Sequence, residues 1–180
     1  MKILKYILFT LGGIIALILI VALFMPKTYH VERSIVIKAP QGVILEQVAN
    51  LKKQNEWSPW AAEDPNMEVS YAGADGQVGS SSSWKSEKMG EGTQTITKLT
   101  NDRVEAKLEF KEPMEGTADA YFQTQPEGDG VKASWGIKGK DKYPMNIMIL
   151  FMDNMIGKQY EKGLASLKVR CEDMAKDSLR

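Results

Sequence analysis

The chain has 180 residues with 23 basic and 23 acidic side chains, so its formal net charge is zero. This balance argues against nucleic-acid binding, which depends on a basic surface that displaces counterions. One cysteine and one histidine exclude an internal disulfide, a cysteine-based metal cluster and a site of paired histidines. We therefore predict no nucleic-acid partner, no metal and no cofactor, and the length suggests one domain plus an additional segment.

The additional segment is at the amino terminus. Residues 6–24, from Tyr6 to Phe24, carry no charge, and as a helix they span about 29 Å, which matches a hydrocarbon core of roughly 30 Å. A cleaved secretory signal is the competing interpretation, but its apolar stretch is only roughly 7–15 residues long. This run is longer and ends in ALFMPK, without an A-x-A cleavage site. We predict that residues 1–28 are an uncleaved transmembrane anchor and its flank.

Positive charges flank this run unevenly. Lys2, Lys5 and the amino terminus precede it, whereas Lys27 and Arg33 follow it. Because cytoplasmic flanks carry the excess of Lys and Arg, the small difference favours a cytoplasmic amino terminus. The sequence thus predicts a single-pass membrane protein whose soluble domain lies in the periplasm or outside the cell.

The soluble part begins with one strand and two short helices. Residues 30–40 alternate apolar and polar side chains, which predicts a strand with one buried face. Pro40 then begins a stretch of apolar residues at helical spacing as far as Leu51, and proline suits a first helical turn. A second short helix is expected at about 52–56, ending before Pro59.

Patterning of period two then continues through six predicted strands. Short breaks rich in Gly, Asp, Asn and Pro separate them, and such connections make neighbouring strands antiparallel. In the clearest strand Val104 and Phe110 share the apolar face, whereas the pattern around Asp119 and Phe122 leaves open which face is interior. The predicted strands cover residues 67–73, 80–87, 92–100, 103–111, 117–125 and 131–139.

The chain ends in a long amphipathic helix. From residue 143 to about 177, apolar residues recur at helical spacing and charged residues occupy the opposite face. The elements together make an α+β layout, in which this helix covers the apolar face of a curved, seven-stranded antiparallel sheet. Because one helix is narrower than such a sheet, the space beside it is either filled by large side chains or left as a cavity.

Six stretches of the soluble part carry a family resemblance. They are VERSIVIKAP (31–40), EWSPW (56–60), DPNM (64–67), GSSSSW (79–84), GEGTQTIT (90–97) and FMDNMIGKQYEKGLASLK (151–168). On these stretches the chain resembles the START-like superfamily, with its helix-grip (Bet v 1-like) fold, and within it the polyketide cyclase/dehydrase-type proteins of the SRPBCC group.

The resemblance covers about residues 30–172 and leaves the apolar amino terminus outside it. It implies a START-like domain at 29–176, followed by a tail at 177–180. The superfamily includes lipid carriers, plant hormone receptors, stress-response proteins and a few enzymes, so the resemblance implies the fold and selects no single activity. It brings no catalytic motif to transfer.

Aromatic and methionine side chains are the candidates for a cavity wall. Two tryptophans lie where the short helices meet the sheet, and they either gate a cavity or plug one end of a filled core. Two more lie in mid-strand, and the methionines of the last helix either line an adaptable apolar site or fill the core. The predicted ligand-binding residues are Trp57, Trp60, Trp84, Phe110, Trp135, Met148, Met152 and Met155.

No residue is predicted to be catalytic. The acidic residues of the soluble part form no motif, and sequence does not reveal the separation that a pair of catalytic carboxylates requires. The single histidine, His30, is expected near the lipid headgroups, and the single cysteine, Cys171, in the packed face of the last helix. The acids considered are Glu56, Asp64, Glu87, Glu109, Glu112 and Asp119.

Three functions fit these expectations. The leading hypothesis is a membrane-anchored START-like domain that binds an apolar or amphipathic small molecule, lipid- or polyketide-like, between the sheet and the last helix. The first alternative is a cyclase or dehydratase that acts on a polyketide-like substrate through a cavity carboxylate or tyrosine. The second is a structural or interaction module with a filled core, which predicts a cavity below the roughly 300 Å³ typical of ligand pockets. Oligomeric state is not predicted.

Overall fold

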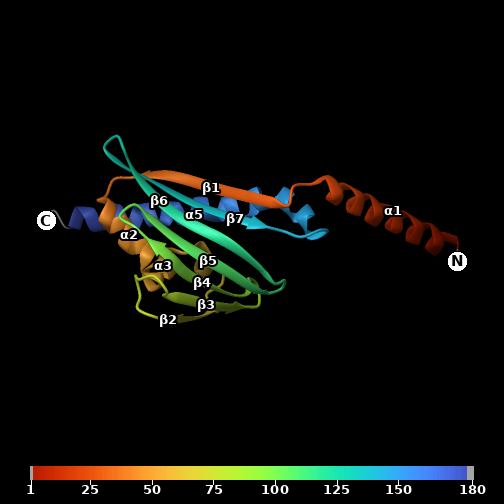
Figure 1. Cartoon of the computed structure of the whole chain (residues 1–180), viewed down its shortest axis with the longest axis horizontal. Coiled ribbons are helices and arrows are strands. Elements are labelled where there is room, and N and C mark those ends of the chain that lie inside the picture. The colour runs from red at the N-terminus through yellow and green to blue at the C-terminus, as the bar shows by residue number, and fades with distance from the viewer. Residues whose placement is uncertain (1, 178–180) are drawn as a thin grey trace.

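The computed structural model describes residues 2–177, and of Lys2 the backbone alone. Of the predicted tail at 177–180, only Asp177 lies within the described residues, as the last residue of the long helix. One apolar helix is followed by a strand, three short helices, six strands and the long helix (Figure 1). The elements are α1 (Lys2–Phe24), β1 (Thr28–Ile37), α2 (Gln41–Ala49), α3 (Leu51–Trp57), α4 (Pro59–Glu63), β2 (Glu68–Ala72), β3 (Ser81–Ser86), β4 (Gly90–Leu99), β5 (Arg103–Glu112), β6 (Gly116–Glu127), β7 (Gly130–Lys140), the 3-10 helix η1 (Met145–Met148) and α5 (Ile149–Asp177).

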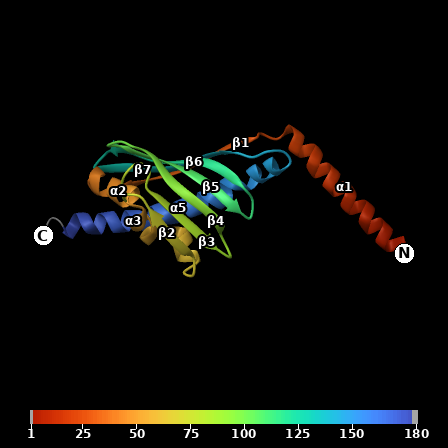
Figure 2. The ribbon, with the colours of Figure 1, turned by 60° about the horizontal axis from the view of Figure 1, so that its bottom comes forward.

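The seven strands form one antiparallel sheet in the order β1-β7-β6-β5-β4-β3-β2. Strands β2 to β7 follow one another across the sheet, and β1 pairs with β7 over its whole length, from Thr28 opposite Lys140 to Ile37 opposite Val131. The sheet curves around α5, and α2 and α3 close the end that is remote from α1 (Figures 1 and 2). The α+β layout expected from the sequence, with its long covering helix, is confirmed.

One short helix was not among the predicted elements. The sequence indicates that helix α3 ends before Pro59, and α3 indeed ends at Trp57. The five-residue helix α4 then begins directly at Pro59, which occupies its first turn. Proline has no amide hydrogen to lose in that position and its fixed backbone angle suits a helix start, so the same residue that ends one helix begins the next.

The core lies between the inner face of the sheet and the helices α2, α3 and α5. The orientation of β6, left open by its pattern, is clear: Ala118 and Phe122 are buried in this core. Tyr121 lies on the opposite face, where its hydroxyl donates to the Glu32 carboxylate and lies 2.7 Å from His30 Nε2. The most buried apolar side chains are Ile37, Ile44, Ile96, Leu164, Leu167 and Cys171, so the packed position predicted for the cysteine is confirmed.

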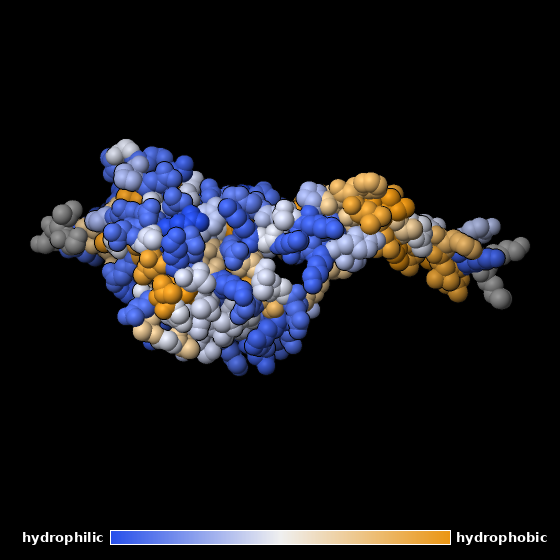
Figure 3. All heavy atoms as spheres, viewed as in Figure 1, coloured by the Kyte–Doolittle hydropathy of each residue, from blue (hydrophilic) through white to orange (hydrophobic). Residues whose placement is uncertain are grey.

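Helix α1 projects away from the domain and carries most of the hydrophobic surface visible in Figure 3. Among its described side chains Ala22 alone is buried, and it lies against η1. The side-chain amide nitrogen of Asn146, fully buried in η1, lies 2.7 Å from the Ala22 carbonyl oxygen and 3.2 Å from that of Met25. The amide of Asp141 donates to the carbonyl of Lys27. The last turn of α1 is therefore fixed to the domain.

Candidate ligand cavity

A cavity of about 280 Å³ lies between the inner face of the sheet and the helices α3, α4 and α5. Strand β5 supplies the apolar residues predicted for its inner face, from Val104 to Phe110, and α5 supplies Ile156 and Tyr160. The lining is mainly aliphatic and aromatic, and among the described residues it includes no Asp, Glu, Lys, Arg, His or Cys. Its polar side chains are those of Gln54, Asn55, Ser58, Ser82, Gln94, Tyr71 and Tyr160, whereas Tyr121 points to the outer face of the sheet.

Aromatic rings form one wall of the cavity. The ring of Trp135 on β7 stacks on that of Tyr160 on α5, with centroids 4.1 Å apart and planes 8° apart. Trp60 on α4 meets both rings edge-on, at 5.5 Å and 6.1 Å. Helix α5 approaches this cluster closely at Gly163, where a Cβ atom would lie 2.7 Å from the Trp135 ring. A glycine at that point thus lets the covering helix seat the aromatic wall.

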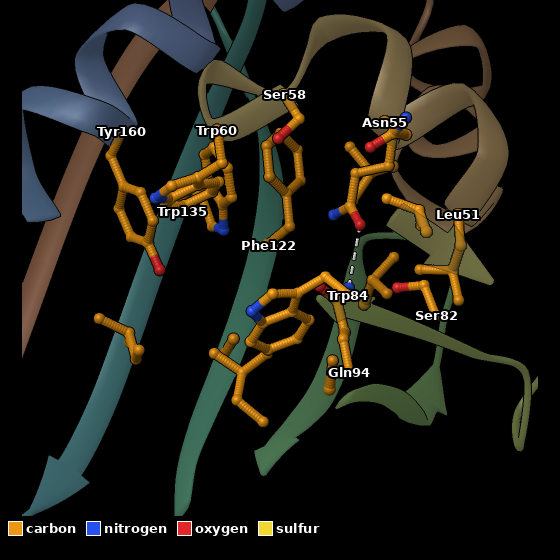
Figure 4. A pocket seen from close by; sticks show the side chains of 18 of the residues that line it. Leu51, Asn55, Ser58, Trp60, Ser82, Trp84, Gln94, Phe122, Trp135 and Tyr160 are labelled. Carbon is orange, nitrogen blue, oxygen red and sulfur yellow. Dashed lines mark hydrogen bonds between the residues drawn. The ribbon is translucent and has the colours of Figure 1, made fainter. Parts of the chain in front are cut away.

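The opposite wall carries Trp84. This residue lies on β3 opposite Gly92, and its ring meets Phe110 of β5 edge-on at 5.9 Å. Figure 4 shows Trp84 from the sheet and Tyr160 from α5 facing the cavity from different sides. At the end near α3, the Gln94 side-chain amide donates to Gln54 Oε1 at 3.0 Å (Figure 4), so these two amides satisfy part of each other's hydrogen bonding.

Several hydrogen-bond donors on the cavity wall have no protein acceptor. Tyr160 is only 2% exposed, and its hydroxyl points into the cavity, where it makes no hydrogen bond to any described residue (Figure 4). Burial raises the pKa of Tyr160 well above that of an exposed tyrosine, which keeps the hydroxyl protonated. The indole N–H groups of Trp60 and Trp84 also lack an acceptor among the described residues, whereas that of Trp57 donates to the Gln47 carbonyl at 3.1 Å.

A second hollow, of about 540 Å³, lies at the end of the sheet near α1. It is more open than the first, and its rim carries charged and hydroxyl side chains such as Asp119, Lys138 and Thr117. The larger volume reflects this openness to solvent. The first cavity is the better ligand site, because it is less open and its wall is apolar, and a pocket that removes more of a ligand's surface from water stabilises the complex more.

Comparison with known proteins identifies the architecture. No protein-family model and no curated protein sequence matches the chain. Among solved structures, a protein from Chromobacterium violaceum superposes with a TM-score of 0.59 at 15% identity, covering 82% of this chain and 99% of that chain. The structure of Ara h 8.0201 gives a TM-score of 0.51 at 10% identity, over 78% of this chain and 97% of that chain.

A third similar structure has two domains. The di-domain ARO/CYC StfQ from the steffimycin biosynthetic pathway gives a TM-score of 0.63 at 10% identity, covering 83% of this chain and 53% of StfQ. The shared features are the curved seven-stranded sheet and the long covering helix. The chain has the helix-grip fold. Identities of this size show the fold and carry no activity with them.

The helix-grip domain brings four of the eight predicted ligand-binding residues to the cavity: Trp60, Trp84, Phe110 and Trp135. The other four lie outside the lining. Trp57 is 4% exposed and packs in the core, edge-on to Trp135 at 5.3 Å. Met148, at the end of η1, and Met152 of α5 are half-buried, and Met155 of α5 is 57% exposed. Ligand binding by any of the eight stays a prediction.

Sequence reasoning missed Tyr160 as a site residue, although it stands in the apolar stripe of the last helix. A polar-tipped side chain within an otherwise apolar stripe is a signal that would have singled it out. None of the six acids considered lies on the cavity wall of the helix-grip domain. Glu56 pairs with Arg170, and Asp64 accepts a hydrogen bond from the Ser86 hydroxyl, which holds the pKa of that carboxyl below its usual value.

Proposed function

We propose that the chain is a single-pass membrane protein whose helix-grip domain, residues 29–176, binds an apolar or amphipathic small molecule in the apolar cavity between the sheet and α5. The observation that carries the proposal is the cavity of about 280 Å³ with its aliphatic and aromatic wall. Removing apolar ligand surface from water contributes about 25 cal/mol per Å². A ligand that buries about 250 Å² of apolar surface thus gains roughly 6 kcal/mol before the entropy losses of association.

The apolar wall of the cavity, and not its size, favours a ligand site over a filled core. A volume of 280 Å³ lies just below the range of ligand pockets, roughly 300–1,000 Å³, and so on the side expected for a filled core. Packed protein interiors contain few voids larger than a water molecule, so a void of this size next to unpaired donors is unusual for a domain that only provides structure. The interaction-module alternative is supported by the volume, which is below roughly 300 Å³, but not by the cavity lining.

The length and exposure of helix α1 support the proposal that it is a membrane anchor. The helix Ile3–Phe24 is long and apolar enough to cross a bilayer, and its side chains are almost all exposed. A cleaved signal and a retained anchor share these properties, but the contacts of Asn146 with Ala22 and Met25 favour the anchor. Cleavage after residue 28 would leave the buried Asn146 amide without its acceptors, at a cost of about 1–3 kcal/mol. We place the domain in the periplasm or outside the cell because Lys2 and Lys5 precede the uncharged run that begins at Tyr6.

Native mass spectrometry of the detergent-extracted full-length protein tests both the ligand-binding function and the retained anchor. We expect the intact mass to include residues 1–28 and a second population of higher mass that carries a co-purified small molecule. Extraction and analysis of that molecule would identify its class. A protein that is ligand-free in every preparation and that binds no hydrophobic fluorescent probe would refute the ligand-binding function, and loss of the first residues would refute the anchor.

An enzyme is the second candidate, and Tyr160 is the observation that favours it. A neutral, buried hydroxyl aimed into a cavity is able to donate a proton or a hydrogen bond to a substrate oxygen. The name of the similar protein StfQ, an ARO/CYC, is compatible with such chemistry on a polyketide-like substrate. If the chain is a dehydratase, the molecule extracted from the Tyr160→Phe variant will differ from the wild-type one by one added water. Identical molecules would favour binding without turnover.

A further inference from the structure

We propose that the buried part of the ligand is uncharged, compact and carries a hydrogen-bond-accepting oxygen, such as a ketone, ester or lactone carbonyl, which the Tyr160 hydroxyl recognises. This inference rests on the proposed ligand-binding function and names the chemistry that the cavity selects. Three properties of the cavity support it: hydrogen-bond donors without a protein acceptor, a wall without charged side chains, and a small volume.

The hydrogen-bond donors of the cavity wall that have no protein acceptor indicate that the ligand carries an acceptor. Tyr160 is 2% exposed as a residue, and its hydroxyl, which borders the cavity space, has no hydrogen-bond partner among the described residues. Buried polar groups are paired in the great majority of native structures, and leaving one unpaired is unfavourable. The Trp84 indole N–H faces the same cavity from the sheet. An acceptor oxygen between α5 and β3 would satisfy one or both donors.

The missing charges exclude an ionised group at that point. The described residues of the cavity wall include no lysine, arginine or histidine that would pair with a carboxylate or phosphate. An ionised group without a partner is strongly disfavoured in a low-dielectric interior, and the hydroxyl and indole donors are neutral. The acceptor is therefore an uncharged oxygen, and any charged head of the ligand lies outside the cavity.

The volume limits the buried part to a small ring system or one short chain. A cavity of 280 Å³ equals the liquid volume of about nine water molecules at roughly 30 Å³ each. That space holds on the order of ten non-hydrogen atoms. Both acyl chains of a membrane glycerolipid would need several times this volume. The structure thus fits a mono- or bicyclic ketone or lactone, or the end of a single chain.

Three ring probes of similar size separate these features in the full-length protein in detergent. Coumarin offers a neutral carbonyl, naphthalene has no acceptor, and naphthoate carries a negative charge at neutral pH. We expect wild-type protein to bind coumarin most tightly and naphthoate most weakly, as measured by quenching of tryptophan fluorescence. The Tyr160→Phe variant keeps the ring that stacks on Trp135, and we expect it to lose about five- to tenfold in coumarin affinity with unchanged naphthalene affinity.

Tyr143→Phe is the matched control, because Tyr143 is 42% exposed and lies outside the cavity lining. It should leave all three affinities unchanged, and the Trp84→Phe variant provides a second test if Tyr160→Phe unfolds. Equal affinities for coumarin and naphthalene in the wild-type protein, or tightest binding of naphthoate, would overturn the inference while the ligand-binding function stands. Failure of every probe to bind would overturn both.

A different observation carries a second inference: we infer that the exposed apolar residues around η1 and the start of α5 lie in the headgroup region of the bilayer that α1 crosses. Asn146 of η1 lies 2.7 Å from the carbonyl of Ala22, which belongs to the last turn of the apolar helix. Any bilayer around α1 therefore reaches η1. The exposed apolar side chains there are Tyr143, Met145, Leu150 and Phe151, at 42%, 45%, 57% and 53% exposure.

Lysine side chains around these exposed apolar residues also favour contact with a bilayer. Lys27, Lys140 and Lys142 are exposed, and none of them has an ion-pair partner among the described residues. Apolar side chains flanked by lysines are typical of surfaces that lie in the interface of an anionic membrane. Figure 3 shows an opening in the domain on the side that faces α1, so this contact would hold that side close to the lipid.

Spin labels on the full-length protein in nanodiscs with anionic lipid test this placement. The matched pair is Leu150→Cys and Val169→Cys, two exposed apolar positions of the same helix at 57% and 62% exposure. We expect the label at Leu150 to be shielded from a water-soluble relaxation agent and the label at Val169 to be fully accessible. Ile15→Cys reports on α1 itself. Equal accessibility at positions 150 and 169 with a shielded position 15 would overturn the contact alone, whereas an accessible position 15 would overturn the anchor.

Discussion

The guanidinium group of Arg33 on β1 lies directly across Gly157 of α5, where a Cβ atom would be only 2.2 Å from Nη2. All five of its N–H donors find acceptors. The Asp153 carboxylate accepts two hydrogen bonds at 2.9 Å, Glu161 accepts one at 2.8 Å, and the carbonyls of Asp153 and Glu32 accept the others. The contact joins the first strand to the helix that covers the cavity, one turn before Tyr160.

The Gly157→Ala variant should destabilise the domain by about 1–3 kcal/mol, the usual range for overpacking, because the new methyl group displaces Arg33 from its acceptors. Helix propensity works in the opposite direction, since alanine favours a helix over glycine by only about 1 kcal/mol. The measurement is denaturant unfolding of the detergent-extracted protein, followed by tryptophan fluorescence.

Gly42 provides the control for this prediction. It lies in α2, and a Cβ atom there would meet nothing within 4 Å. Gly42→Ala should therefore stabilise the protein by about 0.5–1 kcal/mol through propensity alone. If Gly157→Ala also stabilised the protein, Arg33 would not lie across the helix as described.

Stability should also fall in acid because of the same contact. The hydrogen bond from Arg33, then its charge, holds the pKa of Asp153 below its ordinary value of about 3.9. A carboxyl group whose pKa is depressed in the folded state stabilises it above the unfolded-state pKa, and this contribution is lost as the pH falls below about 3.9 towards the folded-state pKa. Because Asp153 is exposed, the effect is small.

The denaturation midpoint measured between about pH 5 and pH 3 checks this expectation. It should decrease in the wild-type protein and decrease less in Arg33→Gln, in which Asp153 has lost its partner. Parallel pH profiles for the two proteins would mean that the Arg33–Asp153 pair does not form in solution.

The periodicity of apolar residues in the sequence predicts which face of a strand or helix is buried, and this sets how much of the fold and the cavity can be predicted. Alternation identifies the buried face of a strand, and it correctly assigned Val104 and Phe110 to the interior. It does not report whether a buried residue meets another side chain or a void. Trp57 and Trp60 are three positions apart, yet one packs in the core and the other on the cavity wall, because a helix ends between them at Ser58.

Contacts between segments that are distant in the sequence could not be predicted either, because periodicity describes each element separately. The pairing of Arg33 with Gly157 requires the position of α5 along β1, and the helical pattern contains no information on that offset. The methionine stripe has correct helical spacing, but the helix is longer than the cavity. Met155 consequently lies outside the cavity and is 57% exposed, whereas Tyr160 lines the cavity.

The two tryptophans of the short helices should respond differently to truncation. Trp57→Ala should destabilise the domain by about 3–5 kcal/mol, since it empties a buried site and leaves the Gln47 carbonyl without its donor. Trp60→Ala should reduce stability less, because this half-buried ring lines the cavity, and should weaken coumarin binding. Unfolding midpoints and fluorescence titrations separate the effects. Equal loss of stability in both variants, with coumarin affinity unchanged in Trp60→Ala, would place both residues in a filled core.

Alkaline conditions should weaken the outer face of the sheet. Burial, together with the hydrogen bond to Glu32, raises the pKa of Tyr121 to about 12, above its ordinary value of about 10. A tyrosine whose pKa is raised in the folded state stabilises it fully below the unfolded-state pKa, and the contribution is lost as the pH rises from about 10 through 12. The denaturation midpoint should therefore decrease over this interval, because the ionised hydroxyl would face the Glu32 carboxylate without a proton to donate.

The Tyr121→Phe variant should be less stable than the wild-type protein at neutral pH and should lose less stability between about pH 10 and 12. Arg103, which lies 4.3 Å from the centre of the Tyr121 ring, keeps its cation–π contact with phenylalanine, so the variant isolates the hydroxyl. Tyr143→Phe is the control, because Tyr143 is 42% exposed and makes no hydrogen bond among the described residues. A pH profile of Tyr121→Phe that parallels the wild-type profile would show that ionisation of other tyrosines accounts for the alkaline loss.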